Sequence, residues 1–398
     1  MTDRSSYGWV VLAAAFVIIT MAVGTLFSLA VFLKPLEDSV GWARSSVSAI
    51  ALLNWIAMGL GSFVAGYLSD RFGSRPVVLG GGVLLGAGLM LSGRTEALWQ
   101  LYVTFGVLVG FGVACFYVPL TVTVIRWFEH RRGLAASIVS SGNGLGTLAL
   151  APLTRWLINN YDWRTAFLIL GEIALVVVIP AALLLRRAPA PALTPMQPAP
   201  GPGLTARRLW TFWHFWTIAL THFACCAAHS GPIFHMVSHA IDQGVPPLAA
   251  AGALGISGLT SIVGRVGTGM VADRVGAKPT LIVGLVLQAM TIFLYVFARE
   301  AGTLYALAMV FGVAYGSVMP LYAVVTREYF GDRAMGTAYG GVFFISCMGM
   351  GLGSYAGGLI HDVLGSYLWL FLGSPPIATM AIVLALTLRP PRAALRPA

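Results

Sequence analysis

A single arginine stands inside an apolar stretch and is the residue best suited to chemistry. Arg265 lies eight residues before Asp273 in the run TSIVGRVGTGMVADRVG, which corresponds to about 12 Å along a helix. An arginine near the middle of a bilayer costs at least about 2.5 kcal/mol, so its side chain should face protein or a water-filled cavity. Ser257, Ser261 and Thr268 lie around Arg265 at successive spacings of four, four and three residues and predict one polar helical face.

The guanidinium of Arg265 has two possible roles. It could bind an anion, because its planar fork of donors suits a carboxylate and stays charged at physiological pH. Alternatively, it could form a structural ion pair with Glu172, the one acidic residue found inside another apolar segment. The anion site is favoured because ionisable residues inside a membrane usually mark functional sites.

Reversible protonation requires a different side chain. His222 and His229 share one face of a helical segment, and the ordinary histidine pKa of about 6.5 suits a proton carrier. Either histidine could instead be hydrogen-bonded within a helix interface. Glu172 is a further candidate, and the substrate could also bring the proton itself.

Other patterns do not predict an enzyme or a cofactor. His235 and His239 are spaced i to i+4 before Asp242, but we expect them at an exposed helix end and predict no metal site. The glycine runs GNGLGT from Gly142 and GMGLGS from Gly349 lie within helical segments, where small residues allow close packing. We find neither a nucleophile-base set nor a nucleotide-binding loop, so we expect a gradient as the energy source.

The elements that position these residues are membrane helices. The chain has 398 residues, 58% hydrophobic and only 10% charged, against about 25% charged in soluble domains. Twelve apolar segments are each long enough to cross a hydrocarbon core of about 30 Å, and their continuity excludes the alternating pattern of a β-barrel. They cover residues 8–33, 45–69, 75–94, 98–125, 132–157, 163–186, 209–237, 247–273, 278–298, 301–327, 333–361 and 365–389. We therefore predict an all-α protein embedded in a lipid bilayer.

The basic residues predict the orientation of the chain. Of 24 Lys and Arg, seventeen fall in the tails and alternate loops of one side, six fall on the other side, and Arg265 belongs to neither. Because short cytoplasmic loops carry excess positive charge, we expect both termini in the cytoplasm. This bias explains the net charge of +10 without a nucleic-acid partner. All four cysteines lie in predicted helices and imply no disulfide framework.

The chain divides into two similar halves. Residues 187–208 contain six prolines and no acidic residue, which predicts an extended linker between six-helix bundles at 1–186 and 209–398. GYLSDRFGSRPVVL from Gly66 aligns with GMVADRVGAKPTLI from Gly269 at an offset of 203, and two further pairs of segments align at offsets of 201 and 202. Such parallel repeats predict a binding site between the halves near the bilayer midplane.

The aligned loops carry a family resemblance. The pattern G-x-L-x-D-R-x-G-R-K/R resembles the signature of the major facilitator superfamily. The first copy comprises Gly66, Leu68, Asp70, Arg71, Gly73 and Arg75, and the second comprises Gly269, Asp273, Arg274, Gly276 and Lys278. The run WFEHRRGLAASIVSSG from Trp127 resembles the helix 5 motif of the monocarboxylate porter family. Charged residues at these helix ends predict a gate that locks or releases the two halves.

The resemblance implies a site as well as a fold. It implies a twelve-helix major facilitator fold, and we expect a monomer in the plasma membrane, which in a bacterium is the inner membrane. Monocarboxylate porters and the related oxalate:formate exchanger hold a substrate carboxylate with a helix 8 arginine at the position of Arg265. Phe27 and Tyr117 lie on helices that line the cavity in this superfamily, and Tyr315 and Tyr322 share a face of the tenth segment. Alternatively, these aromatic rings only pack the bundle.

The predicted substrate carries one carboxylate. The oxalate exchanger has a helix 11 lysine and animal monocarboxylate porters have a helix 1 lysine, but the corresponding segments here contain none. Animal porters also have an aspartate where this chain has Ser261, so any proton carrier must lie elsewhere. We expect transport of a small monocarboxylate such as lactate or pyruvate with a proton, by alternating access. The alternatives are an organic anion exchanger of the oxalate:formate type and a carboxylate sensor that does not transport.

Overall fold

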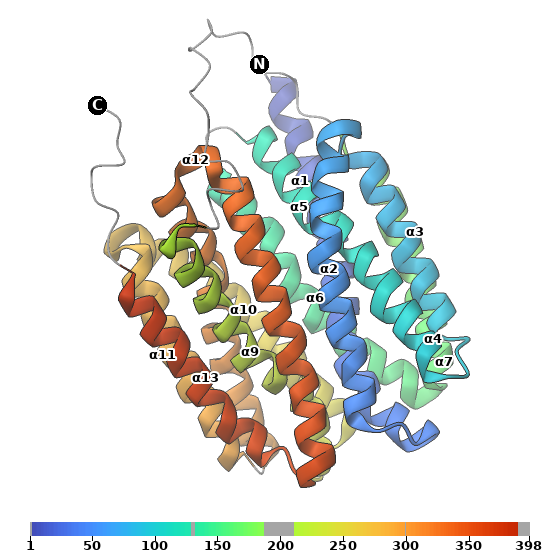
Figure 1. Ribbon diagram of the computed structural model, residues 1–398. Helices are drawn as coiled ribbons and strands as arrows, with labels where there is room; N and C mark the ends of the chain where they lie inside the picture. The colour runs from blue at the N-terminus through green and yellow to red at the C-terminus, as the bar shows by residue number, and fades with distance from the viewer. Residues whose placement is uncertain (1, 129–131, 187–210, 299, 389–398) are drawn as a thin grey trace, which may run out of the picture.

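The computed structural model of the protein describes residues 2–128, 132–186, 211–298 and 300–388. In these ranges the regular elements are helices (Figure 1). They are α1 (Thr2–Val40), α2 (Arg44–Phe72), α3 (Ser74–Ser92), α4 (Leu98–Leu101), the π-helical η1 (Tyr102–Val109), α5 (Gly110–Trp127), α6 (Arg132–Asn160), α7 (Trp163–Leu183), α9 (Trp213–Asp242), α10 (Pro247–Val275), α11 (Ala277–Leu294), the 3-10 segment η2 (Tyr295–Phe297), α12 (Ala301–Leu364) and α13 (Leu368–Thr387). The predicted linker at 187–208 lies outside the described residues.

Most of these helices are long and apolar enough to cross a membrane. Ten stretches of the described chain meet that requirement, and two of them, Ala301–Phe330 and Ala338–Leu364, are consecutive parts of α12. The helices α6 and α9, with 29 and 30 residues, have sufficient length as well and lie within the same bundle (Figure 1). Helices suit a lipid environment because they satisfy their own backbone hydrogen bonds. The prediction of an all-α membrane fold is therefore confirmed.

Two glycines of the repeated motifs make equivalent turns. Gly73 separates α2 from α3 with φ +88°, and Gly276 separates α10 from α11 with φ +99°. Each amide donates to the carbonyl four residues earlier, at Ser69 and Ala272 respectively. Only glycine enters this backbone region readily, so these two motif positions are explained by turn geometry alone.

The helices form two sets that lie side by side. The set α1–α7 occupies one side of the bundle and the set α9–α13 the other (Figure 1). They meet along two seams, α2 with α12 and α6 with α10, and also where α1 contacts α9. In the second seam, a Cβ on Gly144 would collide with the carbonyl oxygen of Gly258. Glycine therefore permits the close approach of the two backbones.

The two ends of the bundle differ in what they carry. In Figure 1, α1 starts at the upper end of the bundle, and α13 also runs upward and ends at the left edge, well apart from α1. We call the opposite end, where α1 ends and α2 begins, the distal end. The same end holds the last turn of α9 and the last turn of α12.

Candidate functional site

A central cavity lies between the two sets of helices. Its volume is about 90 Å³, and side chains of α1, α2, α5 and α6 line it from one set and those of α9, α10 and α12 from the other. A single water needs roughly 10–15 Å³, and sites for drug-sized ligands span roughly 300–1,000 Å³. The cavity therefore has the size of a site for a small molecule. Five of the predicted residues line it: Phe27, Tyr117, His222, Arg265 and Tyr315.

Arg265 is buried in this cavity without a carboxylate partner. Its side chain is 4% exposed, and Nε has no hydrogen-bond partner. The guanidinium carbon lies 5.5 Å from the centroid of the Tyr315 ring, a cation–π distance. Arg265 forms no ion pair with any acidic side chain that the structure describes. Glu172, the alternative partner, is exposed on α7 and does not line the cavity.

A buried guanidinium without an acidic partner, such as that of Arg265, is unfavourable in a protein that binds no anion beside it. Removing a charge from water costs several kcal/mol unless a counter-charge or several hydrogen bonds offset it. No acidic side chain lines the cavity in the described part of the chain. The Arg265 site is therefore suited chemically to an anion that enters the cavity.

Two further polar side chains face the cavity with unused hydrogen-bonding atoms. Asn143 of α6 and His222 of α9 both line it, and Asn143 Oδ1 and His222 Nδ1 are buried without a partner. Asn143 was not among the predicted site residues. The sequence contained one signal for Asn143, because its polar amide lies inside the apolar segment 132–157. A polar side chain at that depth usually faces a partner or a cavity and not lipid.

Aromatic rings form the apolar walls of the cavity. Tyr117 of α5 stacks on Phe343 of α12, with ring centroids 5.7 Å apart and planes inclined by 3°. Phe343, which the sequence analysis missed, joins Phe27 and Tyr315 in the lining. These rings leave room for the small apolar body of a ligand beside the guanidinium.

Two predicted binding residues lie behind the lining. The Tyr322 ring stacks on the His222 ring with centroids 3.8 Å apart, and its hydroxyl donates to the carbonyl oxygen of Thr221 at 3.4 Å. Ser261 Oγ donates to the carbonyl oxygen of Gly258 at 2.7 Å. Neither Tyr322 nor Ser261 lines the cavity, so both are placed to support cavity residues.

The two histidines proposed as proton carriers occupy different positions. His229 Nδ1 lies 2.7 Å from the carbonyl oxygen of Cys225, which can only accept, so Nδ1 carries hydrogen and donates. His229 Nε2 has no partner, and this side chain does not line the cavity. Of the three predicted carriers, only His222 borders the cavity.

The prediction that His235 and His239 lie at an exposed helix end is wrong for His235, whereas His239 does lie in the last turn of α9, where it is partly buried. His235 is fully buried, and its Nε2 donates to the carbonyl oxygen of Ser354 at 2.8 Å. Burial raises the pKa of Tyr367, so its hydroxyl keeps its proton and donates to His235 Nδ1 at 3.0 Å. Helix α9 continues to Asp242, so His235 lies well inside the bundle. In the described residues, no group of three or more potential ligands is placed to hold a metal ion.

Comparison with known proteins identifies the family. The Major Facilitator Superfamily matches residues 11–298 and, in a second match, residues 266–398. The chain belongs to the Major Facilitator Superfamily. Its members are transporters and not enzymes, as predicted. The predicted twelve-helix major facilitator fold is confirmed as well.

Several relatives in this superfamily are monocarboxylate transporters. Monocarboxylate transporter 13 of Bos taurus is 32% identical over 363 residues, which cover 91% of this chain and 84% of the relative. Monocarboxylate transporter 11 of Homo sapiens is 32% identical, with 92% and 79% covered. Monocarboxylate transporter 3 of Rattus norvegicus is 31% identical, with 96% and 80% covered.

A solved structure shares the fold. It is the crystal structure of a bacterial homolog to the human lysosomal transporter Spinster, in an inward-facing and unoccupied conformation. The two superpose with a TM-score of 0.71 over 97% of this chain and 95% of that chain, at 14% sequence identity. The sequence identity is low enough that this likeness concerns the fold alone.

The superfamily signature lies at the end of the bundle opposite the distal end. Arg71, Arg75 and Arg274 are exposed there, whereas the side chains of Asp70 and Asp273 lie outside those that the structure describes. The role of both motif copies as a gate therefore stays a prediction. Lys278 of the second copy donates to the carbonyl oxygens of Leu386 and Leu388. It caps the end of α13 within its own set of helices.

Proposed function

We propose that the protein is a secondary active transporter of small monocarboxylates of the lactate and pyruvate type, coupled to a proton. The observation that carries this proposal is Arg265, a buried guanidinium without an acidic partner in a small cavity between two sets of helices. The relatives support the substrate class, since transporters at 31–32% identity over most of the chain are monocarboxylate transporters.

The cavity has groups for each part of such a substrate. The carboxylate binds the fork of Arg265, where charge-assisted hydrogen bonds are short and strong. The aliphatic body packs against Phe27, Tyr117 and Tyr315. Asn143 and His222 then reach the substituent next to the carboxylate. A second carboxylate finds no second arginine or lysine in the described lining, so the substrate carries one charge.

Transport follows from neutralising the buried charge. A carboxylate beside Arg265 turns an isolated cation into an ion pair, which lowers the cost of closing the cavity to water. The two sets of helices then rock about the site and expose it to the other side. The proton gradient supplies the energy. The excess of Lys and Arg in the tails and alternate loops supports cytoplasmic termini in a plasma-membrane protein.

We expect an inward proton gradient to drive lactate accumulation in proteoliposomes. With one proton per carboxylate, a difference of one pH unit should support about tenfold accumulation, because a unit of pH corresponds to about 1.4 kcal/mol. Replacing His222 by glutamine should abolish this accumulation, since glutamine keeps polar atoms but binds no proton. The measurement is radiolabelled lactate uptake with and without the gradient.

Exchange provides the control for this experiment. Lactate counterflow needs no net proton movement, so His222→Gln should retain it while losing gradient-driven uptake. The variant His229→Gln, altered outside the cavity lining, should keep both activities. Lactate uptake by the wild-type protein that does not depend on the proton gradient would favour an anion exchanger. Unchanged lactate accumulation by His222→Gln would show that His222 is not the proton carrier.

We expect the Asn143→Leu variant to bind lactate about three- to tenfold more weakly. Leucine has the same branching at Cγ, although it is larger, and it cannot form the hydrogen bond available to the unpartnered amide; one such bond contributes about 0.5–1.5 kcal/mol. The KM for lactate measures this effect. Asn160→Leu is the matched control, because Asn160 lies on the same helix but is exposed and bonds to Trp156. Equal KM values for the two variants would exclude a role for Asn143.

A further inference from the structure

A charge cluster joins the two sets of helices at the distal end. Arg44, at the start of α2, donates from Nη1 and Nη2 to the two carboxylate oxygens of Asp242, at 2.5 and 2.9 Å. Its Nε donates to Glu37 of α1 at 2.8 Å. The Arg44 side chain is 2% exposed and that of Asp242 is 26% exposed, so the guanidinium of this two-pronged pair between α2 and α9 is shielded from water while the carboxylate is partly solvated. The bidentate geometry makes the pair stronger than an ordinary surface ion pair.

A second carboxylate crosses the same seam. Asp362 of α12 accepts the backbone N–H groups of Arg44 at 3.2 Å and of Ser45 at 2.7 Å. The N-cap residue of α2, Ala43, provides no side-chain cap of its own. The first turn of α2 therefore has its cap from the opposite set of helices, and separating the sets leaves these amides unpaired.

The backbones at this seam approach closely because of one glycine. A Cβ added to Gly358 of α12 would lie 2.6 Å from the carbonyl oxygen of Arg44 and would also collide with Ser48 Oγ. Tyr367 covers the cluster from the other side, with its ring centroid 5.3 Å from the Arg44 guanidinium carbon. The closed arrangement thus depends on packing as well as on charge.

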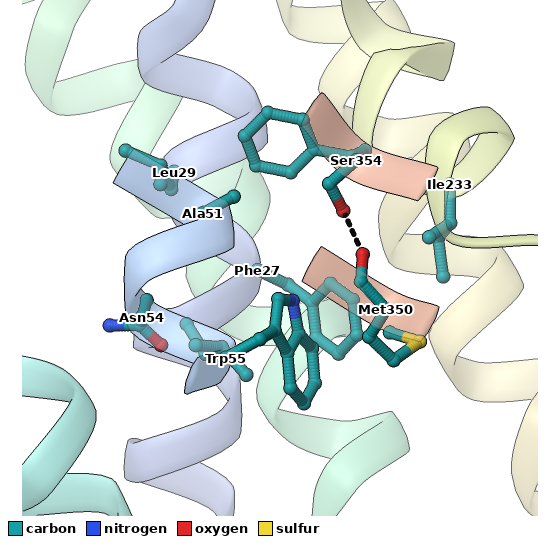
Figure 2. A pocket seen from close by; sticks show the side chains of 10 residues that line it. Phe27, Leu29, Ala51, Asn54, Trp55, Ile233, Met350 and Ser354 are labelled. Carbon is teal, nitrogen blue, oxygen red and sulfur yellow. Dashed lines mark hydrogen bonds between the residues drawn. The ribbon is translucent and has the colours of Figure 1, made fainter. Parts of the chain in front are cut away.

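A narrow pocket with mostly apolar walls, which we call the neck, lies between this cluster and the central cavity; Asn54 and Ser354 are its polar lining residues. Figure 2 shows a pocket of about 10 Å³, room for about one water, lined by residues of α1, α2, α9 and α12. It shares Leu26, Phe27, Trp55 and Met350 with the central cavity. On α1 and α12, the neck residues Leu29 and Ser354 lie closer to the distal end than the residues of the central cavity. The charge cluster lies beyond them. The route from the cavity to the distal face is therefore closed by two successive layers.

We propose that Arg44, Asp242 and Asp362 form a charge latch that holds the distal end closed, so that breaking it shifts the protein toward a form open at that end. This proposal rests on the alternating access of the proposed function. In it, these contacts determine the balance between the forms closed and open at the distal end. The latch pairs α2 with α9 and α12, which belong to opposite sets. Opening must therefore break both the two-pronged pair and the helix cap.

Neighbouring charges determine how completely one substitution opens the latch. Lys34 lies 3.8 Å from Asp242 and 3.2 Å from both Glu37 and Asp38, and His361 Nε2 lies 3.7 Å from Asp242. His361 Nδ1 also lies 3.9 Å from Asp362. Lys34 retains part of the attraction when Arg44 is removed, and His361 adds to it only in its protonated form. Loss of Arg44 should therefore shift the balance between forms without leaving every carboxylate unpaired.

The test is a distance measurement across the distal end by electron paramagnetic resonance. Spin labels are placed at Glu96→Cys and Glu300→Cys, two exposed positions in opposite sets, in a chain whose four native cysteines are replaced by alanine. We expect Arg44→Gln and, independently, Gly358→Ala to raise the population of long distances at least about fivefold. The exposed Arg94→Gln should leave the distribution unchanged. The exchanged pair Arg44→Asp with Asp242→Arg should restore part of the short distance.

Arg44→Gln and Gly358→Ala weaken the latch by different physical means. If one of the two variants misfolds, the other still tests the proposal. Gly358→Ala keeps every charge and acts by steric overlap, whereas Arg44→Gln keeps the packing and removes the charge. Distance distributions like that of the parent in both folded variants would overturn the latch. The measurement needs no substrate, so loss of lactate transport in the Arg265 experiments would overturn the proposed function without affecting this result.

Discussion

Lactate counterflow should fall at least about 100-fold when Arg265 is replaced by glutamine. The substitution removes the two charge-assisted hydrogen bonds that the guanidinium offers to a carboxylate, each contributing about 1.5–3 kcal/mol. Since about 1.4 kcal/mol corresponds to a factor of ten, the loss of both exceeds that magnitude. Glutamine also relieves the protein of an unpaired buried charge. The variant should therefore fold at least as well as the parent while losing transport.

Two companion variants separate charge from geometry. Arg265→Lys keeps the positive charge but offers a point charge in place of a planar fork, so we expect intermediate counterflow. Arg94→Gln makes the same substitution as the main variant at an exposed position and should leave counterflow unchanged. Near-normal counterflow in Arg265→Gln, with normal protein levels, would remove Arg265 from the binding site.

Replacing Gly316 by alanine should disturb both stability and substrate binding. A Cβ at Gly316 would collide with the backbone of Ser261, one helical turn from Arg265. To relieve this overlap, α12 must move away from α10 and displace the adjacent Tyr315, whose ring contacts the guanidinium. Overpacking typically costs about 1–3 kcal/mol. We expect a thermal unfolding midpoint lower by several degrees and a higher KM for lactate.

A second glycine provides the matched control. A Cβ at Gly267, two residues beyond Arg265 on α10, would meet no atom within 4 Å. Gly267→Ala should therefore leave KM unchanged and can raise the unfolding midpoint, because alanine is favoured over glycine in helices by about 1 kcal/mol. Equal midpoints and KM values for Gly316→Ala and the parent would show that the α10–α12 contact does not position the site.

The fold and the depth of Arg265 follow from simple sequence patterns. Continuous apolar segments allow only helices in lipid, so the positions of the predicted spans match the helices well. The repeated turn glycines, Gly73 and Gly276, also mark equivalent helix ends in the structure. A lone charge in such a segment must avoid lipid, and Arg265 indeed faces an internal cavity.

The orientation of side chains around each helix was harder to predict. Ser261 and Arg265 follow helical spacing, yet Ser261 packs against Gly316 while Arg265 reaches the cavity. Asn143 was missed because α6 contains small residues on several faces, and only its packing against α10 shows which face borders the cavity. His235 was misplaced because the span predicted for its helix ended five residues before Asp242, the last residue of α9.

The latch has no signal in the sequence because its partners are far apart in the chain. Arg44 and Asp242 are separated by 198 residues, and Arg44 and Asp362 by 318. In the sequence, Arg44, Asp242 and Asp362 are separate charged residues near predicted loops, and each one resembles an ordinary solvated residue. Only the approach of α2 to α9 and α12 brings them together and buries the guanidinium. Contacts of this kind depend on the closed arrangement of the two sets.

The carboxylate-binding role of Arg265 is tested most directly by an experimental structure of the protein with bound lactate. The carboxylate oxygens should lie within hydrogen-bonding distance of the Arg265 guanidinium, at roughly 2.7–2.9 Å, with the methyl group against the aromatic walls formed by Tyr117 and Phe343. Lactate bound elsewhere, or Arg265 paired with an acidic side chain of the protein while lactate occupies the cavity, would contradict the proposed site.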